Sequence, residues 1–503
     1  MTQPTGTRLS RRTILQVSAA SAATLAVSAP PIVSHVAAQS VATPAAGATP
    51  AVGATPTADQ AALFAELDAF IAQRMAELRV PGVALGIIDG DVEHSAGYGV
   101  TNLDYPMPVD AATLFQIGST TKTVTGTTAM RLVEQGRLDL DAHVRDYLPA
   151  FRVADEAASA EVRIRNLVTH TAGWFGDDLS ETGDGDDALA VFVERMAALP
   201  QLFPVGEYFS YNNAAVDALG RVIEVITGQT YEQAARDLVL TPLGMDACAF
   251  FAEEIMTRPF AVGHTASPDD PTGPPVTVAQ WAIPRASNPA GGVISTITDQ
   301  LRYVRFHLGD GTVAGTPVLQ PATMAAMQQP MGPGGSLGAT VLDGVGVNWL
   351  LSTRAGARVV AHGGSTFGQQ SAFMLVPERG FGVTVLTNSD SGAVLAEDVA
   401  NWALGRFLGL TEEVPAGTPV PAAAQGDYVG TYEGGNDLQL VVESTDTGLT
   451  LSVLGQSLDL RLVSEDRCVT VLQGLPQLID FVRDAAGQVG WLRISGRMAP
   501  KSA

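Results

Sequence analysis

A serine and a lysine three residues apart are the first pair whose side chains could do chemistry together. Ser119 and Lys122 lie in the stretch Phe115-Gln-Ile-Gly-Ser-Thr-Thr-Lys-Thr-Val124, which is typical of a helix start. Residues i and i+3 of a helix share a face, so the amine could reach the hydroxyl and take its proton. The amine must be neutral for this, so its pKa must fall from about 10.4, which burial and nearby hydrogen-bond donors can achieve. The alternative is a chance Ser-x-x-Lys on a solvated helix.

Lysine is otherwise almost absent from the chain. Lysines and arginines together number 29, but only Lys122 and Lys501 are lysines, and Lys501 lies in the C-terminal tail. Arginine cannot be deprotonated in a protein, whereas the pKa of a lysine can be tuned. Lysine thus stands at the one internal position where a removable proton would matter. This favours a catalytic interpretation, with Ser119 as nucleophile and Lys122 as its base.

A second stretch, Gly206-Glu-Tyr-Phe-Ser-Tyr211-Asn212-Asn213, opens a predicted helix. The Tyr211 phenol could pass a proton between the serine, the lysine and a leaving group. The Asn213 amide could orient Lys122 and a substrate amide. Ordinary aromatic packing with an asparagine helix cap is the alternative for this stretch.

A third stretch, His362-Gly363-Gly364-Ser365, follows a predicted strand at 357–361. Paired glycines let a substrate lie close to an edge strand, where a backbone N–H can face a developing oxyanion. A glycine turn with a surface histidine is the alternative. His-Gly-Gly also occurs in α/β-hydrolase esterases, but there it precedes a Gly-x-Ser-x-Gly elbow, which this chain lacks.

The N-terminal residues have the pattern of an export signal. Ser10-Arg11-Arg12-Thr13-Ile14-Leu15 is a twin-arginine pattern ahead of a weakly apolar run, and Val36-Ala37-Ala38 offers small residues for cleavage. The run is too short and too rich in Ser and Thr to span a bilayer. We expect residues 1–38 to direct export to the periplasm or the outside, with an uncleaved disordered tail as the alternative. Residues 39–58 repeat Ala, Thr, Pro and Gly, which predicts a disordered linker.

Residues 59–410 show the periodicities of an α+β domain. Thr57-Ala-Asp-Gln60 has the pattern of a capping box, and the strands 83–88 and from Val92 predict a hairpin turning at Asp89-Gly90. A long amphipathic helix should run from Ser119 to near Gly136. The segments expected beyond it are a mainly helical part at 160–245, a Pro-rich surface excursion at 265–290, a helix at 298–308, strands at 345–351, 357–361, 370–376 and 381–387, and a helix at 391–408.

Strands near both ends of this domain bracket a helical middle, which predicts an antiparallel sheet flanked by helices plus an all-helical subdomain. Residues 411–424 contain three prolines and are expected to be a linker. Residues 425–503 predict a small all-β barrel or sandwich. Its expected strands are 428–433, 438–443, 449–454, 458–463, 468–472, 478–483 and 488–494.

The net charge, the cysteines and the acidic residues indicate which kinds of partner and binding site can be expected. A formal net charge of -23 argues against nucleic acid, because phosphate binding needs a basic face. The two cysteines, Cys248 and Cys468, imply no disulfide scaffold or Cys-rich metal site, and unlinked packed thiols are favoured over a single bridge. The acidic run from Asp177 to Asp187 lacks EF-hand spacing, so a solvated loop is favoured over a cation site or an amine-selecting site. We expect no metal and no cofactor, and the sequence leaves the oligomeric state open.

Together the three motifs resemble the serine β-lactamase and penicillin-binding superfamily, particularly its class C-like branch of D-aminopeptidases, D-Ala-D-Ala carboxypeptidases and family VIII esterases. They occur in the family's order and at similar intervals over roughly residues 60–408. The C-terminal part resembles the lipocalin-like domain of some peptidases in this group. Further matching stretches are Leu167-Val-Thr-His170-Thr-Ala-Gly173, Phe203-Pro-Val-Gly206, Pro242-Leu-Gly-Met245 and Ala290-Gly-Gly-Val-Ile-Ser295.

The resemblance implies that Ser119 is acylated, that Lys122 is its base, and that Tyr211 is a second acid/base assisted by Asn213. It also implies an oxyanion hole made by the backbone N–H groups of Ser119 and Ser365. His362 stands where β-lactamases carry a lysine, so a substrate carboxylate would lack a permanent cation there at neutral pH.

The expected activity is cleavage of a D-amino-acid peptide or amide, or of a small ester. The alternatives are β-lactamase or D-Ala-D-Ala carboxypeptidase activity, and a catalytically silent envelope protein that binds peptides.

Overall fold

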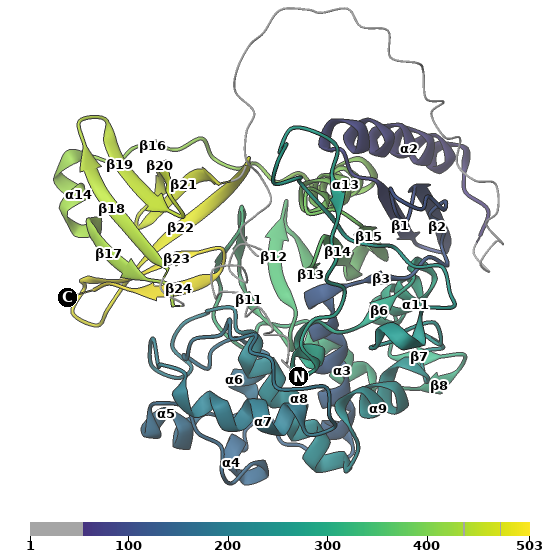
Figure 1. Cartoon of the computed structure of the whole chain (residues 1–503), viewed down its shortest axis with the longest axis horizontal. Coiled ribbons are helices and arrows are strands. Elements are labelled where there is room, and N and C mark those ends of the chain that lie inside the picture. The colour runs from purple at the N-terminus through teal and green to yellow at the C-terminus, as the bar shows by residue number, and fades with distance from the viewer. Residues whose placement is uncertain (1–53, 436–437, 473, 503) are drawn as a thin grey trace, which may run out of the picture.

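A seven-stranded antiparallel sheet forms the centre of the larger part of the molecule (Figure 1). The computed structural model describes residues 54–435, 438–472 and 474–502, so the predicted export signal lies outside the described residues. In sheet order the strands are β11 (Gly344–Val345), β12 (Leu350–Arg354), β13 (Ala357–Thr366), β14 (Gln369–Val376), β15 (Phe381–Thr387), β1 (Gly82–Asp89) and β2 (Val92–Gly99). Strands from both ends of the domain meet where β15 pairs with β1, as the sequence predicts.

Helices cover both faces of this sheet. The terminal helices α2 (Ala58–Leu78) and α13 (Gly392–Leu408) pack together on one face, and α11 (Ile297–Leu308) packs on the other against β1 and β15. Alternate residues of β1 therefore enter two different cores: Val83 and Leu85 join one, and Ala84 the other. Burial on both faces explains why β1 is a continuous apolar run rather than an alternating one.

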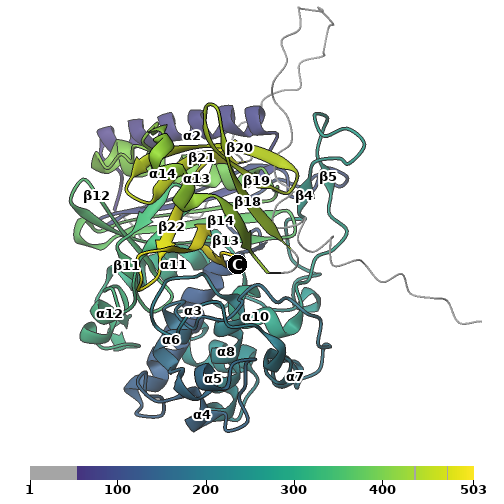
Figure 2. The ribbon, with the colours of Figure 1, turned by 90° about the vertical axis from the view of Figure 1, so that its left-hand side faces the viewer.

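The helical subdomain lies beyond the α11 face (Figure 2). Its helices are α3 (Thr121–Glu134), α4 (Val144–Tyr147), α5 (Glu156–Glu161), α6 (Ile164–Val168), α7 (Ala188–Arg195), α8 (Asn213–Thr227), α9 (Tyr231–Ala235) and α10 (Asn288–Gly291). The prediction that α3 is amphipathic is wrong, because every residue from Thr121 to Met130 is buried. Its threonines look polar in sequence, but hydroxyls such as that of Thr128 donate to backbone carbonyls of the same helix.

Three local boundaries differ from the predictions. The expected strand 345–351 is interrupted, because β11 ends at Val345 and β12 begins at Leu350. The expected strand 357–361 continues to Thr366, because the His-Gly-Gly-Ser stretch pairs with β14 along its length. The hairpin turn is Gly90-Asp91, one residue later than predicted, since Asp89 pairs with Val92.

Short elements complete this part of the chain. They are β3 (Phe115–Gln116), β6 (Ile294–Ser295), β4 (His264–Thr265), β5 (Val276–Thr277), β7 (Thr312–Val313), β8 (Thr316–Pro317), α12 (Pro321–Met327), β9 (Gly335–Leu337) and β10 (Thr340–Leu342). The capping box at Thr57 and Gln60 is confirmed at the start of α2. The hairpin of β4 and β5 lies in the Pro-rich excursion, much of which is exposed.

The C-terminal part is a nearly closed antiparallel barrel. Its elements are β16 (Thr418–Pro419), α14 (Ala422–Tyr428), β17 (Gly430–Glu433), β18 (Gln439–Thr445), β19 (Gly448–Val453), β20 (Gln456–Ser464), β21 (Arg467–Leu472), β22 (Leu475–Arg483), β23 (Val489–Ile494) and β24 (Arg497–Pro500). The last strand returns to the first, where Tyr432 bridges Lys501. Two features differ from the predictions: β24 was not expected, and the expected linker 411–424 contains β16, which pairs with β20, and the start of α14.

The barrel docks against the domain that carries the large sheet. Asp480 on β22 accepts the Ser336 N–H of β9 at 2.9 Å and pairs with the buried Arg493 at 2.7 Å. Arg493 in turn donates to the Phe209 carbonyl at 3.1 Å. The hydrogen bonds of these two buried charged residues thus join the barrel to β9 and to the segment before α8.

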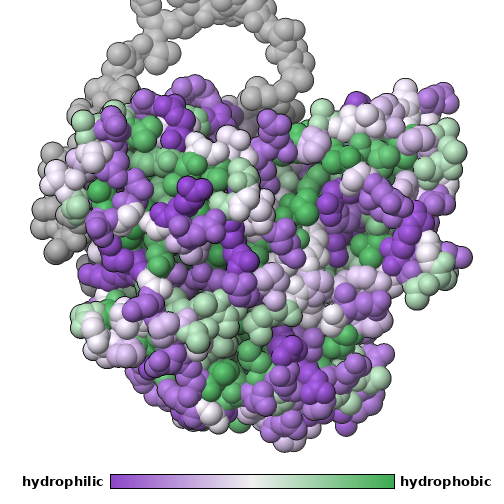
Figure 3. Space-filling view, turned by 180° about the vertical axis from the view of Figure 1, so that it is seen from behind, coloured by the Kyte–Doolittle hydropathy of each residue, from purple (hydrophilic) through white to green (hydrophobic). Residues whose placement is uncertain are grey.

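From behind, hydrophilic and hydrophobic residues are interspersed over the surface (Figure 3). Among the helices that the structure describes, none has the length and apolar character needed to cross a bilayer. Cys248 and Cys468 are both free and buried, which confirms unlinked thiols.

Candidate active site

The predicted nucleophile and base are in contact. A short 3-10 turn (Gly118–Thr120) carries Ser119 into α3, whose second residue is Lys122. The Lys122 Nζ donates to the Ser119 Oγ at 3.0 Å and to the Ala290 carbonyl at 2.7 Å. Lys122 is completely buried, whereas Ser119 remains partly exposed. The amine therefore approaches the serine from inside the protein, and the hydroxyl stays open to a substrate.

Burial makes Lys122 suited to act as a base. It lowers the pKa of Lys122 from 10.5 to about 7. Asp217 and Asp177 oppose this fall, and the positive charge of Arg497 adds to it. A substantial fraction of the amine is thus neutral near pH 7, as proton abstraction from serine requires.

Two glycines let β13 approach the nucleophile closely. Gly118 has a positive φ of 51°, and a Cβ there would lie 2.5 Å from the Ser365 nitrogen. A Cβ at Gly364 would lie 1.9 Å from the Ile117 oxygen and 2.7 Å from the Ser119 nitrogen. Only glycine fits at either position. This approach places β13 directly beside the turn that carries Ser119.

Tyr211 lies on the other side of the nucleophile. Burial raises the pKa of its phenol, and a hydrogen bond with Ser119 opposes that rise. Its ring centre is 5.0 Å from the Lys122 Nζ. The ring stacks on His170 with centroids 4.5 Å apart, and the His170 Nδ1 accepts the Asn212 N–H at 3.1 Å. His170 thus holds the segment that carries Tyr211.

Asn213 does not make the predicted contact with Lys122. Its Nδ2 donates to the Asp177 Oδ1 at 2.8 Å, and no hydrogen bond joins it to Lys122 among the residues that the structure describes. Asp177 belongs to the acidic run that was expected to be a solvated loop. For this residue the expectation is wrong, because Asp177 also pairs with Arg497 at 2.9 Å.

His362 lies in the cleft as a neutral imidazole. Burial and the nearby Lys122 lower the pKa of His362 to about 3. Its Nδ1 faces the Gly363 carbonyl at 2.7 Å, so this nitrogen donates when it carries the proton. At neutral pH the His362 side chain therefore carries no positive charge, as the sequence implies for this position.

The barrel brings a cation into the cleft. Arg497 at the start of β24 lies with its guanidinium carbon 4.8 Å from the centre of the Tyr211 ring. The preceding Gly496 accepts the Tyr211 N–H at 2.8 Å. Sequence reasoning missed Arg497 because the strand that carries it was not predicted, and nothing in the spacing of the motifs points to a residue so far along the chain.

A cavity of about 430 Å³ unites these residues. It is lined by Ser119, Tyr211 and the stretch His362–Ser365, and also by three barrel residues, Gln477, Ser495 and Arg497. The barrel is thus one wall of the cleft that contains the nucleophile.

Asp217 on α8 is a second residue that sequence reasoning missed. It is fully buried, and its Oδ1 accepts the Ala290 N–H at 3.2 Å. Ala290 is also the residue whose carbonyl accepts the Lys122 ammonium. Burial raises the pKa of Asp217 well above its ordinary value. The position, four residues after Asn213 within α8, gave no signal of this role.

Two further histidines and one residue of the acidic run make contacts away from Ser119. The His264 Nδ1 lies 2.8 Å from the Asn388 carbonyl, and His307 packs edge-on against Trp349. Asp186 in the acidic run pairs with Arg285 at 2.8 Å. No group of three or more His, Cys, Asp or Glu residues is placed to hold a metal ion in the described part of the chain.

A family model described as Beta-lactamase matches residues 67–406. The chain belongs to the β-lactamase family. Penicillin-binding protein 4 of Amycolatopsis lactamdurans is 36% identical over 364 residues, which are 71% of this chain and 94% of that protein. Esterase EstB of Burkholderia gladioli is 35% identical over 212 residues, 39% of this chain and 54% of the esterase.

The similarity to solved structures covers the barrel as well as the β-lactamase-like part. The crystal structure of SurE matches with a TM-score of 0.73 at 26% identity and covers 88% of this chain and 100% of that chain. SurE with D-Leu matches with a TM-score of 0.71 at the same identity. This member of the β-lactamase family is therefore a serine hydrolase, as the sequence predicts.

Proposed function

We propose that this serine hydrolase cleaves an amide or ester through an acyl-enzyme on Ser119, with Lys122 as base and Tyr211 as second acid/base. The observation that carries the proposal is the 3.0 Å contact between a buried lysine amine and the serine hydroxyl. A lysine with a pKa of about 7 can take a proton from serine at neutral pH.

In the first half-reaction the neutral Lys122 Nζ takes the proton of the Ser119 Oγ as that oxygen bonds to the substrate carbonyl carbon. The carbonyl electrons move to its oxygen, which the N–H groups of Ser119 and Ser365 stabilise. Collapse of this intermediate breaks the bond to the leaving amine or alcohol. The leaving group takes its proton from the Lys122 ammonium by way of the Tyr211 hydroxyl, leaving an ester on Ser119.

In the second half-reaction water replaces the leaving group. Its proton passes to the Tyr211–Lys122 pair as its oxygen attacks the ester carbon. The Ser119 Oγ then departs and recovers the proton, which restores the free enzyme.

The charge distribution favours a substrate with a carboxylate near the scissile bond. His362 is neutral, and two arginines line the cleft, Arg354 and Arg497, of which Arg497 lies beside Tyr211. We infer that Arg497 takes the part of the lysine that β-lactamases carry at the position of His362. The structure of SurE with D-Leu supports a D-amino-acid peptide or amide as the substrate, and the esterase relative supports a small ester.

Two other functions compete with this proposal. The penicillin-binding protein relative favours β-lactamase or D-Ala-D-Ala carboxypeptidase activity on cell-wall or β-lactam substrates. A catalytically silent peptide-binding protein is the second alternative, against which the contact between Ser119 and Lys122 counts. Turnover of nitrocefin would favour the first, and failure of every acylating probe to label folded protein would favour the second.

The experiment compares the wild type with Ser119→Ala. A fluorophosphonate probe should add its mass to the peptide that contains Ser119, and the variant should lose both labelling and turnover of chromogenic esters and D-amino-acid amides. Ser457→Ala is the matched control, because it removes an exposed serine hydroxyl of the barrel that does not line the cleft. Undiminished turnover by Ser119→Ala would exclude the mechanism.

We also propose that the chain is exported, on the basis of the twin-arginine pattern at Arg11 and Arg12. Replacing both arginines with lysine should leave the protein in the cytoplasm of a bacterial host.

A further inference from the structure

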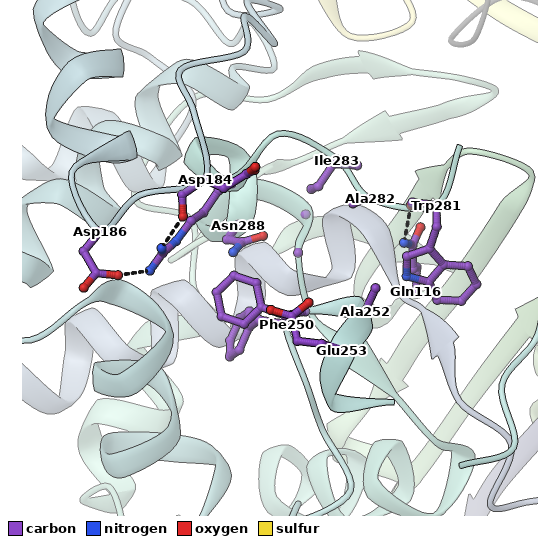
Figure 4. Close-up of a pocket in the computed structure, with 14 residues that line it drawn as sticks. Gln116, Asp184, Asp186, Phe250, Ala252, Glu253, Trp281, Ala282, Ile283 and Asn288 are labelled. Atoms are coloured by element: carbon purple, nitrogen blue, oxygen red, sulfur yellow. Dashed lines mark hydrogen bonds and ion pairs between the residues drawn. The ribbon is translucent and has the colours of Figure 1, made fainter. Parts of the chain in front are cut away.

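A second cavity, of about 490 Å³, lies against α10, whose residues Asn288 and Gly291 line it. Three aromatic residues line it, Phe250, Phe251 and Trp281, together with three acidic residues, Asp184, Asp186 and Glu253. Figure 4 shows Gln116 and Trp281 at one end, Asp186 at the other, and Phe250 and Glu253 between them.

The wall of this cavity is the backbone that holds the catalytic lysine. Gly291 and Gly292 line it and follow Ala290, whose carbonyl accepts the Lys122 Nζ. A Cβ at Gly291 would lie 3.8 Å from the Gly118 carbonyl carbon, which is ordinary van der Waals contact. The acyl group of the substrate would be bonded to Ser119, the residue that follows Gly118. The side chain of that acyl residue can therefore pass Gly291 and reach the cavity.

The charge around the cavity is negative. Arg285 is the cation among its lining residues, against three carboxylates, which gives 1 - 3 = -2. Arg285 is already occupied: it donates to the Asp184 carbonyl at 2.6 Å and pairs with Asp186 and Glu232. The field of the cavity therefore favours a positively charged ligand over an anion.

Gln116 gives an independent indication of a ligand. Its side chain is only 6% exposed and lines the cavity, and its Nε2 donates to the Trp281 carbonyl at 2.5 Å. The Oε1 accepts no hydrogen bond from the residues that the structure describes. A buried acceptor without a donor is costly, so an N–H group of a ligand would stabilise it.

The aromatic walls give apolar surface to the cavity. Arg236 lies 5.4 Å from the centre of the Phe250 ring, and Arg285 lies 5.1 Å from the centre of the Phe251 ring, so one face of each ring is already covered by a guanidinium group. The remaining surface of the rings suits the methylene chain of a long side chain.

We propose that this cavity binds the side chain of the substrate residue attacked by Ser119, and that this side chain carries an amine or guanidinium. The inference rests on the proposed acyl-enzyme, because the acyl residue is the part of a substrate that Ser119 brings next to Gly291. The inference specifies that the substrate residue attacked by Ser119 is basic.

Binding to an inactive variant tests this inference without turnover. Ser119→Ala protein is titrated by calorimetry with the amides of lysine and of norleucine, in both D and L forms. Norleucine keeps the chain of lysine without its amine. We expect the lysine amide of the preferred stereoisomer to bind about fivefold or more tightly, as two or three partly screened charge contacts allow. Added salt should reduce that ratio.

Two double variants in the same background locate the effect. Asp184→Asn with Glu253→Gln removes two carboxylates from the cavity and leaves the pair of Arg285 with Asp186, and it should bring the ratio close to one. Glu194→Gln with Asp246→Asn removes two exposed carboxylates that do not line the cavity, and it should leave the ratio unchanged.

The outcomes separate this inference from the proposed function. Equal binding of the two amides, or a ratio that the cavity variant leaves unchanged, overturns the inference whatever the catalytic result. Loss of probe labelling at Ser119 in active protein would instead refute the acyl-enzyme. Gln116→Met is a further check and should weaken the lysine amide more than the norleucine amide.

Discussion

The guanidinium of Arg497 lies 4.8 Å above the ring of Tyr211, although Arg497 comes from the barrel and Tyr211 from the helical subdomain. Burial raises the pKa of Tyr211 and lowers the pKa of Lys122, and the positive charge of Arg497 opposes the first shift and adds to the second. Asp177 pairs with Arg497 at 2.9 Å. The barrel therefore sets part of the electrostatic environment of the cleft as well as part of its wall.

The pH dependence of acylation should report this arrangement. Lys122 must be neutral to act, so kcat/KM should rise with pH through a midpoint near its pKa of about 7. Arg497→Gln removes a cation that disfavours the ammonium, so the pKa of Lys122 should rise and the midpoint should move to higher pH. Arg483→Gln, at a barrel arginine outside the cleft, is the control. An unmoved midpoint in Arg497→Gln would show that the cation does not act on the base.

The two glycines of β13 should respond very differently to a methyl group. In Gly364→Ala the Cβ would lie 1.9 Å from the Ile117 oxygen, which forces β13 away from the nucleophile. Misplacement by about 1 Å costs on the order of 100-fold in rate, so kcat/KM should fall by that factor. Gly363→Ala meets only the Ser371 oxygen, at 3.2 Å, and should stay within a fewfold of the wild type. Similar rates for the two variants would contradict the close approach.

Tyr211→Phe should keep the stacked ring and lose the proton carrier. General acid/base catalysis contributes about 100-fold to 10,000-fold, so kcat should fall within that range. The stacking on His170 needs only the ring, and stability should change little. Tyr208→Phe is the neighbouring control, because its hydroxyl donates to a barrel carbonyl rather than to the nucleophile. Normal turnover by Tyr211→Phe would remove the phenol from the mechanism.

Loss of Arg493, the buried partner of Asp480, should lower the free energy of unfolding more than loss of Arg467, the more exposed partner. Arg493→Met leaves Asp480 buried with one partner fewer and breaks the bond to Phe209, which should cost about 3 kcal/mol in unfolding free energy. Arg467→Met removes a more exposed partner of the same carboxylate and should cost about 1 kcal/mol or less. Denaturant unfolding measures both. Equal losses would argue against a docking role for Arg493.

The sequence was informative where the chemistry depends on local spacing. Ser119 and Lys122 are one helical turn apart, so their contact follows from the pattern alone. The central sheet could also be predicted, because its strands carry clear periodicities and good turns. The prediction that α3 is amphipathic was wrong, because its buried threonines look polar in sequence but bond to their own backbone.

The parts that could not be predicted depend on contacts between distant segments. Arg497 reaches Tyr211 only because β24 closes the barrel and the barrel docks on β9. Asp217 on α8 accepts a hydrogen bond from Ala290 on α10. Asp177 pairs with Arg497, although it belongs to an acidic run that looks solvated in sequence. A single sequence contains no periodicity that encodes such contacts.

The protonation of Lys122 can be measured directly, because the chain has only two lysines. Lysine labelled with ¹³C at Cε gives one signal for Lys122 and one for Lys501, and Lys501→Arg assigns them. The account predicts that the Lys122 signal titrates with a midpoint near pH 7 in the free enzyme. A Lys122 signal that stays protonated until about pH 10, as an exposed lysine does, would contradict the claim that a neutral amine activates Ser119.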